Sequence, residues 1–330
     1  QLCSQISKKL EIIFDISNGI ALTDVFSSLY LVAREKKYTQ PEIVNNKEIS
    51  ILEGRHPIVE NVLGSEKFIS NDTIISNHEN QVLLITGPNM SGKSTYLKQV
   101  GIITLMAQIG SYVPAKEAKI GVVDRIFTRV GLQDDLTVGQ STFMVEMIES
   151  AYILNQATQD SLIILDEIGR GTSTYDGLAI AQSIAEHIHN HPYLGCKTLF
   201  ATHYHEMTQL EKNLPRIKNF HIAVSEDNEK VVFLRKVIPG GANKSYGVHV
   251  AKLAGLPNPV INRAWELLNE LEKSNISNSD TCIESGIQLD FLNEQNHVLE
   301  EIKKIDIASL TPIEAITKLY EFQKIIDSDS

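Results

Sequence analysis

The stretch "TGPNMSGKST", residues 86–95, directly follows the apolar run Val82–Ile85 and decides the class of fold. From Gly87 to Ser94 it has the pattern G-x-x-x-x-G-K-S, and apolar residues at helical spacing come next. A strand, a glycine-rich turn and a helix in this order predict a phosphate-binding loop. The backbone N–H groups of such a loop turn inward, the helix N-terminus adds partial positive charge, and Lys93 adds a full one. The alternative is an ordinary glycine turn.

Three more residues fit a site for nucleotide hydrolysis. Ser94 would place its hydroxyl on a magnesium ion. In "LIILDEIGRGTS", Asp166 ends a second apolar run, where it would hold the same ion through water. Glu167 follows it and is placed to orient or deprotonate the attacking water. The alternative for the two carboxylates is a solvated pair at a strand end.

Two further stretches could contact the terminal phosphate. "STFMVEM", residues 141–147, opens a predicted helix, so Ser141 is either an anion-binding group or a plain helix N-cap. "ATHYHE" places His203 immediately after a third apolar run. Parallel strands bring their carboxyl ends to one edge of a sheet, so His203 should lie beside the phosphate loop and could hydrogen-bond a phosphate. The alternative is a structural histidine.

The composition limits the other classes of function. The 330 residues suggest about two domains, on a prior of roughly 150 residues each, and 42% are apolar, enough to bury a core. The net charge of -11 argues against a self-sufficient grip on nucleic acid, because clustered Lys and Arg supply most non-specific affinity. Cys3, Cys196 and Cys282 show neither metal spacing nor a disulfide pattern, which fits a reducing compartment.

Membrane and targeting signals are not expected either. No run approaches the roughly 18 to 20 apolar residues of a membrane span, and no basic leader precedes an apolar core. We therefore expect a cytoplasmic protein without a membrane partner. Because the chain begins with Gln1, we also expect it to be a fragment of a longer protein.

Strand and helix patterns alternate through the middle of the chain. The short apolar runs predict strands buried on both faces of a parallel sheet, and the periodic segments between them predict helices on its faces. The strands are expected at 82–85, 162–165 and 198–201, and the helices at 94–109, 142–157 and 176–189. This order predicts an α/β fold of the doubly wound type.

The flanks add less regular elements. We expect helical structure over 1–37, strand-like segments over 49–62, a polar loop over 70–80, a hairpin of 220–224 with 231–234, and a helix starting at Asn258. Residues 273–288 are rich in Ser and Asn and predict a linker. Thr311 to Glu314 has the spacing of a capping box with proline at the first helical position, which predicts a final helix over Pro312–Ile325.

Together these stretches resemble the ATPase domain of the MutS family of DNA mismatch repair proteins, of the bacterial type. The match includes "TGPNMSGKSTYLKQ", "GSYVPA", "DRIFTRVG", "STFMVEM", "LDEIGRGTSTYDG", "ATHYHE" and "KSYGVHVAKLAGLP", in that family's order over about residues 50 to 272. The resemblance implies a P-loop NTPase of the ABC-like kind, with a mostly parallel sheet flanked by helices, a helical segment before it and a small helical tail after it.

The resemblance also assigns residues to the nucleotide. ATP phosphates would be held by Gly87, Pro88, Asn89, Met90, Ser91, Gly92, Lys93, Ser94 and Thr95. Adenine would contact Phe68 and the segment near Arg235, where the family commonly has histidine, and Ser91 stands where glycine is commoner. Lys93, Glu167 and His203 would act in catalysis, Ser94 and Asp166 would hold Mg²⁺, and Ser141 would reach the γ-phosphate bound by the opposite subunit.

The implied organisation has four parts: the end of a helical core region (1–40), the ATPase domain (41–272), a linker (273–288) and a helical tail (289–330). The expected partners are a second copy of the chain, with the tail as a candidate for higher assembly, double-stranded DNA through the full-length protein, and a MutL-type repair protein. ATP binding and hydrolysis would change the shape of a DNA clamp in the cytoplasm, at the nucleoid, and the mismatch-reading domain would lie outside this chain.

Two alternatives remain at this point. One is another ABC-type ATPase, of a transporter or of chromosome maintenance, which predicts a stretch like "LSGGQ" where this chain has "GQSTFMVEM". The other is a module that binds nucleotide only to dimerise and does not hydrolyse it, against which Glu167 argues.

Overall fold

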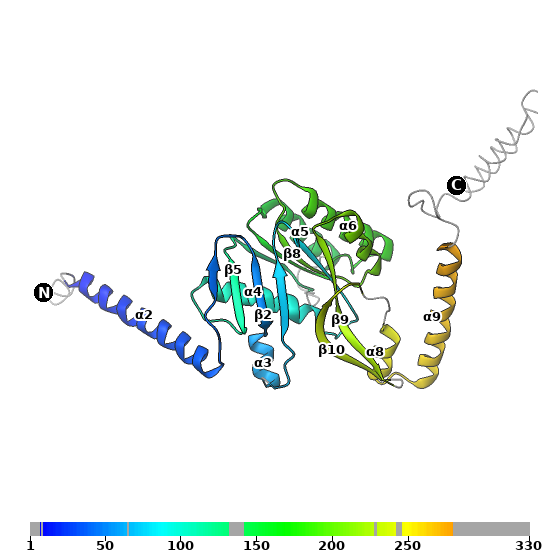
Figure 1. Ribbon diagram of the computed structural model, residues 1–330, viewed down its shortest axis with the longest axis horizontal. Helices are drawn as coiled ribbons and strands as arrows, with labels where there is room; N and C mark the ends of the chain where they lie inside the picture. Colours follow the sequence, from blue (N-terminus) through cyan, green and yellow to red (C-terminus); the bar gives the residue numbers. More distant parts are fainter. Residues whose placement is uncertain are drawn as a thin grey trace, which may run out of the picture. The chain divides into compact units, whose positions relative to one another are not determined.

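The computed structural model describes residues 7, 9–64, 66–131, 142–227, 230–241 and 246–279 (Figure 1). The chain divides into two compact units, Gln1–Pro257 and Asn258–Ser330. Both β-sheets and the predicted phosphate loop belong to the first unit, and the described part of the second is one helix, α9 (Asn258–Ser279).

A six-stranded sheet carries the predicted α/β fold. Its order is β10-β9-β4-β8-β7-β6, and all neighbours are parallel except the antiparallel pair β10 and β9. The bounds are β4 Val82–Thr86, β6 Ile126–Arg129, β7 Leu162–Asp166, β8 Lys197–Ala201, β9 Ile217–Asp227 and β10 Lys230–Pro239. Every residue of β4, β7 and β8 is buried, which explains their unbroken apolar runs. The three predicted strands and the hairpin are confirmed.

Helices cover both faces of this sheet. They are α4 (Lys93–Gln108), α5 (Thr142–Gln156) and α6 (Thr174–Asn190), close to the predicted bounds. Alternate residues of β4 belong to two different cores: Leu83 and Ile85 pack with α4, whereas Val82 and Leu84 share a cluster with α5 and α6. The mostly parallel sheet flanked by helices is therefore confirmed.

A second, four-stranded sheet was not predicted. Its order is β1-β5-β2-β3, with β1 and β5 parallel and the other pairs antiparallel. The bounds are β1 Glu42–Val44, β2 Ile49–Gly54, β3 Asn71–Ile75 and β5 Glu117–Gly121. Its buried isoleucines share one core with α4 and with β4, so α4 lies between the two sheets (Figure 1).

The segment before the phosphate loop corrects one expectation. The pattern predicts strands over 49–62, but the strand ends at Gly54 and Pro57–Leu63 forms helix α3. This helix begins where it does because a proline occupies its first turn and His56 caps it, with the ring Nδ1 accepting a hydrogen bond from the Val59 N–H at 3.4 Å. The expected strand over the second half of this segment is wrong.

The predicted polar loop over 70–80 is also wrong in its first half, which is strand β3. Asn71, Thr73 and Ile75 are buried at alternate positions, and the residues between them are exposed. Two of the three inward-facing side chains are polar, so the alternation did not stand out in the sequence.

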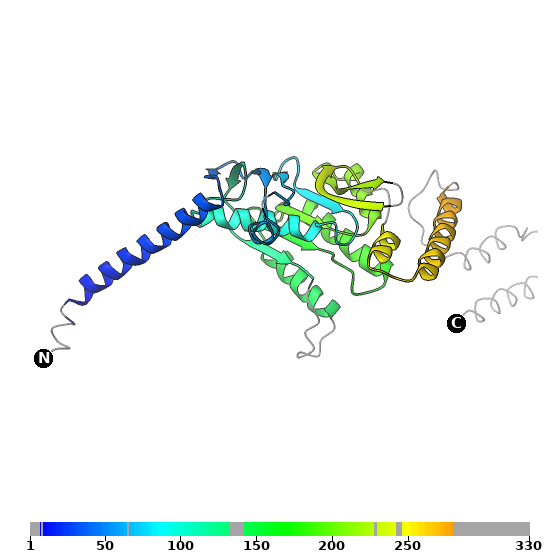
Figure 2. The ribbon, with the colours of Figure 1, turned by 90° about the horizontal axis from the view of Figure 1, so that it is seen from below.

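Helix α2 (Leu10–Glu35) confirms the helical expectation for the start of the chain. Only Ala33 of this helix is buried, and the described residues pack against it along little of its length (Figure 2). Over a window of 18 residues the mean hydropathy of α2 is 1.3, so by length and composition alone this helix could cross a membrane, although it contains no unbroken apolar run of the expected length. The same test is met by helices that pack against other parts of a protein.

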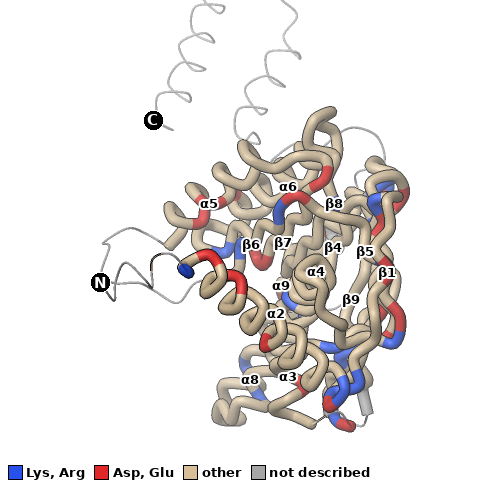
Figure 3. Tube along the Cα trace, turned by 90° about the vertical axis from the view of Figure 1, so that its left-hand side faces the viewer, with Lys and Arg blue, Asp and Glu red and all other residues tan. Residues whose placement is uncertain are grey.

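Charged positions are interspersed along the described trace (Figure 3). Acidic residues outnumber basic ones, 41 to 30. The expectation that DNA contact would need other parts of a longer protein remains a prediction.

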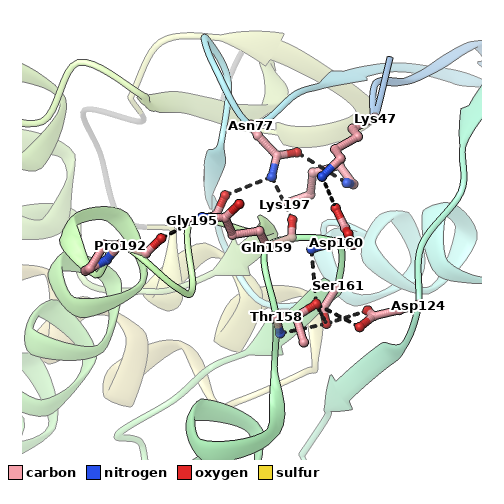
Figure 4. Close-up of polar contacts among 10 residues, drawn as sticks. All are labelled: Lys47, Asn77, Asp124, Thr158, Gln159, Asp160, Ser161, Pro192, Gly195 and Lys197. Carbon is pink, nitrogen blue, oxygen red and sulfur yellow. Dashed lines mark hydrogen bonds and ion pairs between the residues drawn. The ribbon is translucent and has the colours of Figure 1, made fainter. Parts of the chain in front are cut away.

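A polar network ties the two sheets together at the amino ends of β7 and β8 (Figure 4). Asn77, just after β3, donates hydrogen bonds to the carbonyl oxygens of Gln159 (2.7 Å) and Gly195 (2.9 Å). The ammonium group of the buried Lys197 donates to the Asn77 side chain at 3.3 Å, and Lys47 forms an ion pair with Asp160. The network lies at the end of the strands opposite the phosphate loop.

The remaining described elements follow β8. They are the 3-10 helix η1 (His205–Gln209), α7 (Leu210–Asn213), α8 (Gly247–Leu253) and α9. Helix α9 begins at Asn258 as expected but continues through Ser279, so the first residues of the predicted linker 273–288 are helical. The tail 289–330, with its predicted final helix, lies outside the described residues, and the domain boundaries at 40, 272 and 288 remain predictions.

Candidate functional site

The predicted phosphate loop connects β4 to the N-terminus of α4. Gly87 (φ 144°) and Gly92 (φ 108°) have the positive φ angles that residues with side chains rarely adopt. Gly92 is the N-cap residue of α4, so the chain passes from a left-handed turn directly into a helix of 16 residues. The strand, turn and helix that the motif requires are therefore present.

Lys93 is buried within this loop. Its Nζ donates hydrogen bonds to the carbonyl oxygens of Gly87 (2.6 Å) and Pro88 (3.1 Å). It also lies 3.8 Å from Oε1 of Glu167, so the loop and the end of β7 meet at this ammonium group. Burial lowers the pKa of Lys93, and the charges of Glu167 and Asp166 oppose this shift.

Asp166 and Ser94, the two predicted magnesium ligands, also come together. Burial raises the pKa of Asp166, and a hydrogen bond from the Ser94 side chain opposes this shift. The Oδ1 atom of Asp166 is buried and has no hydrogen-bond partner among the described residues. A hydroxyl and an unpaired carboxylate oxygen beside a phosphate loop fit Mg²⁺, which is held in such sites by few protein ligands together with phosphates. Within the described ranges, no cluster of three or more His, Cys, Asp or Glu forms a separate metal cage.

Glu167 is partly buried at the first position after β7, with a φ angle of 55°. Its backbone N–H donates to the Ala201 carbonyl at 2.9 Å, which fixes the residue against β8. Its side chain accepts a hydrogen bond from Arg170, whose own side chain is exposed. The carboxylate thus lies between the cations of Lys93 and Arg170.

His203 follows β8 at the same edge of the sheet. The residue as a whole is exposed to solvent. The surrounding protein nevertheless desolvates the ring in part, which lowers the pKa of His203, and the charge of Glu167 opposes this shift. Its ring centroid lies 4.1 Å from that of Tyr204. Five of the predicted catalytic or metal residues therefore share one edge of the sheet: Lys93, Ser94, Asp166, Glu167 and His203.

Ser141, the sixth such residue, lies outside the described residues, because the description resumes at Thr142. The helix that it precedes, α5, contributes a side chain that the sequence analysis missed. Glu146 is buried, accepts a hydrogen bond from the Gly169 N–H at 2.5 Å, and pairs with Arg129 at 3.4 Å. A charged residue one turn into an amphipathic helix gives no sign of burial, so the sequence alone could not identify it.

Two adjoining hollows lie at the phosphate loop. The smaller, about 200 Å³, is lined by most of the predicted phosphate-binding residues together with Glu167. The larger, about 390 Å³, is mostly apolar and is lined by α3, Phe68 and Arg235. The two share Met90, Gly92 and Thr95, so a polar hollow opens beside an apolar one. Ser91 lines neither hollow and its side chain is buried.

Comparison with known proteins identifies the family of this chain. The family model for MutS domain V matches residues 83–272, which is more than half of the chain. The DNA mismatch repair protein MutS of Dehalococcoides mccartyi (strain CBDB1) is 56% identical over 310 residues, covering 93% of this chain and 36% of the relative. The MutS proteins of Acetivibrio thermocellus (52% over 332 residues, 97% of this chain and 38% of the relative) and Chloroflexus aurantiacus strain J-10-fl (50% over 340 residues, 98% and 35%) are similar.

The chain thus spans somewhat more than a third of the length of these relatives. The matched region contains the phosphate loop, both carboxylates at the end of β7, and His203. The chain therefore belongs to the MutS family and contains its domain V, the ATP-binding domain.

Proposed function

We propose that this chain is the ATPase module of a DNA mismatch repair protein, which binds ATP with Mg²⁺ and hydrolyses it. The observation that carries the proposal is the meeting of Lys93, Ser94, Asp166 and Glu167 at the loop between β4 and α4. A buried cation, a hydroxyl paired with a carboxylate, and a second carboxylate beside them are the parts that phosphoryl transfer to water requires.

Each group has a distinct part in this chemistry. The backbone N–H groups of Gly87 to Thr95 and the Lys93 ammonium hold the phosphates, while Ser94 and Asp166 hold Mg²⁺, whose charge would offset that of the phosphates. Glu167 orients the attacking water and accepts its proton. His203 donates a hydrogen bond to the terminal phosphate, and the apolar hollow at Phe68 and Arg235 takes the adenine.

Coupling to the rest of the protein requires a second copy of the chain. Ser141 of one chain would contact the γ-phosphate bound by the other, so that ATP and ADP favour different arrangements of the pair. In the full-length protein this difference would change the shape of a clamp on double-stranded DNA and signal to a MutL-type repair protein. Such a protein would act in the cytoplasm, at the nucleoid, and the tail 289–330 is a candidate for assembly beyond a dimer.

A phosphate-release assay of the Glu167→Ala variant tests the proposal. General acid–base groups contribute about 10²- to 10⁴-fold to a rate, so the variant should lose at least about 100-fold in turnover. Its affinity for ATP, measured by calorimetry, should remain, because Lys93 and the loop are unchanged. Glu117→Ala, which removes an exposed carboxylate of β5, is the matched control.

Two outcomes would contradict the catalytic role. One is the absence of turnover in the unaltered chain at saturating ATP and Mg²⁺, which would favour a module that only binds nucleotide. The other is an unchanged rate in Glu167→Ala.

A further inference from the structure

The edge strands of the two sheets meet beside the apolar hollow. Strand β3 is the last strand of the four-stranded sheet, and β10 is the last strand of the six-stranded sheet. Asn71, the first residue of β3, is 5% exposed and joins the two strands. Its Nδ2 donates to the Arg235 carbonyl at 3.0 Å, and its Oδ1 accepts from the Val237 N–H at 2.8 Å.

The Asn71 side chain occupies the position of a neighbouring strand along an irregular part of the edge strand β10. The register between β9 and β10 shifts between Phe233 and Val237. Arg235 lies within the shift and has a φ angle of 54°, a backbone conformation that residues with a side chain rarely adopt. The Asn71 amide supplies one donor and one acceptor on the two sides of Lys236, the next residue along, as a neighbouring strand would. A further contact links the same two segments, because Lys236 Nζ donates to the Ser70 carbonyl at 2.8 Å. These contacts of Asn71 and Lys236 together form a joint between the start of β3 and β10.

The joint forms one wall of the hollow of about 390 Å³. Phe68, Ile69 and Asn71 line it from the β3 side, and Arg235 lines it from the β10 side. Its width at this wall therefore depends on the distance that the Asn71 amide maintains. We propose that Asn71 is a positioning residue, which holds Arg235 over the apolar hollow and thereby sets the affinity for the base of the nucleotide. This inference rests on the proposed function.

The two backbone groups that Asn71 contacts require a side chain with both a donor and an acceptor. A planar group with a donor and an acceptor can bond a carbonyl and an N–H group at the same time. An aspartate has the same shape and keeps the acceptor, but it has no donor for the Arg235 carbonyl. Asn71→Asp therefore removes, with little change in volume, the hydrogen bonds that Nδ2 donates to the Arg235 carbonyl and, at 3.4 Å, to the Ile69 carbonyl, whereas Asn71→Ala also removes the one accepted from Val237.

The experiment measures the binding of two probes by calorimetry, ATP with Mg²⁺ and inorganic tripolyphosphate with Mg²⁺. Tripolyphosphate occupies the phosphate loop but has no base. We expect Asn71→Asp and Asn71→Ala to weaken ATP binding by about tenfold, the equivalent of one hydrogen bond, and to leave tripolyphosphate binding within about twofold. Asn219→Ala is the matched control, because Asn219 is also buried and donates to a backbone carbonyl, that of Thr208, at 2.7 Å.

A double-mutant cycle with Arg235 tests whether Asn71 acts by positioning Arg235 or only by stabilising the fold. If Asn71 acts through Arg235, then Asn71→Ala in an Arg235→Ala background should change ATP affinity by less than about twofold. The inference would be overturned if both Asn71 variants bind ATP as the unaltered chain does. It would also be overturned if they lose ATP and tripolyphosphate binding equally, or if the Arg235→Ala background leaves the effect of Asn71→Ala undiminished. If the unaltered chain binds neither probe, the proposed function fails instead.

Discussion

Tyr96 shows how one buried polar group links α4 to the four-stranded sheet. Its hydroxyl forms a hydrogen bond with the Thr73 side chain at 2.9 Å and lies 3.2 Å from the Asp72 carbonyl. Burial raises the pKa of Tyr96 to about 12, and the Thr73 hydrogen bond opposes the shift only in part. The residue sits one turn after Lys93, so this contact also anchors the start of the helix that the phosphate loop enters.

The raised pKa gives a testable pH dependence. The folded-state pKa lies above the unfolded value of about 10, so the neutral phenol stabilises the fold fully below pH 10 and this contribution is lost as the pH rises toward 12. Between pH 8 and pH 11 the unaltered chain should lose about 1 kcal/mol more unfolding free energy than Tyr96→Phe. Urea unfolding at the two pH values measures this difference. Equal losses in the two proteins would show that Tyr96 does not titrate as its burial implies.

Some residues of the site could be predicted from the sequence, and others could not. Lys93 was predicted from the phosphate-loop motif. Asp166, Glu167 and His203 were predicted because they lie at or just after the end of an apolar run, and the structure brings all four residues to one edge of the sheet. Glu146 was not, because its partner Gly169 lies 23 residues away and only the packing of α5 makes the two meet.

At the scale of elements, α6 packs directly on the turn that follows β7. The carbonyl of Gly169 accepts a hydrogen bond from the Tyr204 hydroxyl at 2.9 Å, while its N–H donates to Glu146. The first turn of α6 approaches the same residue so closely that a Cβ atom on Gly177 would overlap the Gly169 carbonyl and the Tyr204 hydroxyl. Helix α5, helix α6 and the segment after β8 therefore all fix the turn that carries Glu167.

Gly177→Ala tests this packing. Alanine favours a helix over glycine by about 1 kcal/mol, but here overpacking should cost about 1–3 kcal/mol or more and should displace the turn, so that both stability and ATP turnover fall. Gly19→Ala is the control, since Gly19 lies within helix α2 and a Cβ atom there meets nothing within 4 Å. It should leave turnover unchanged and keep or raise stability. A Gly177→Ala protein as stable and as active as the unaltered chain would contradict the packing argument.

Two elements that the sequence patterns missed, β3 and α3, gave weak local signals for different reasons. Strand β3 buries Asn71 and Thr73, which are polar, and α3 is too short for its periodicity to register. The buried polar side chains of β3 are satisfied by distant partners, the Arg235 carbonyl for Asn71 and the Tyr96 hydroxyl for Thr73, so local hydrophobicity carries little signal there.

At the scale of the whole molecule, the proposed site needs two chains. Mixing a Ser141→Ala chain with a Lys93→Ala chain tests this sharing. In a mixed dimer one site would combine both defects and the other would be intact, so random pairing should restore about a quarter of the unaltered activity when each parent is inactive. Phosphate release from the mixture, compared with each parent alone, measures it. A mixture as inactive as its parents would refute a shared site.

Local order in the sequence determined the phosphate loop, the alternation of strands and helices around it, and the family. These features depend on contacts between near neighbours: a strand leads into a turn, and the turn opens a helix. Only the tertiary structure decided the second sheet, the contacts that hold Gly169, and the hydrogen bonds of Asn71 between β3 and β10. The amide of Asn71 finds its partner 164 residues along the chain, and no local pattern specifies a hydrogen bond over that separation.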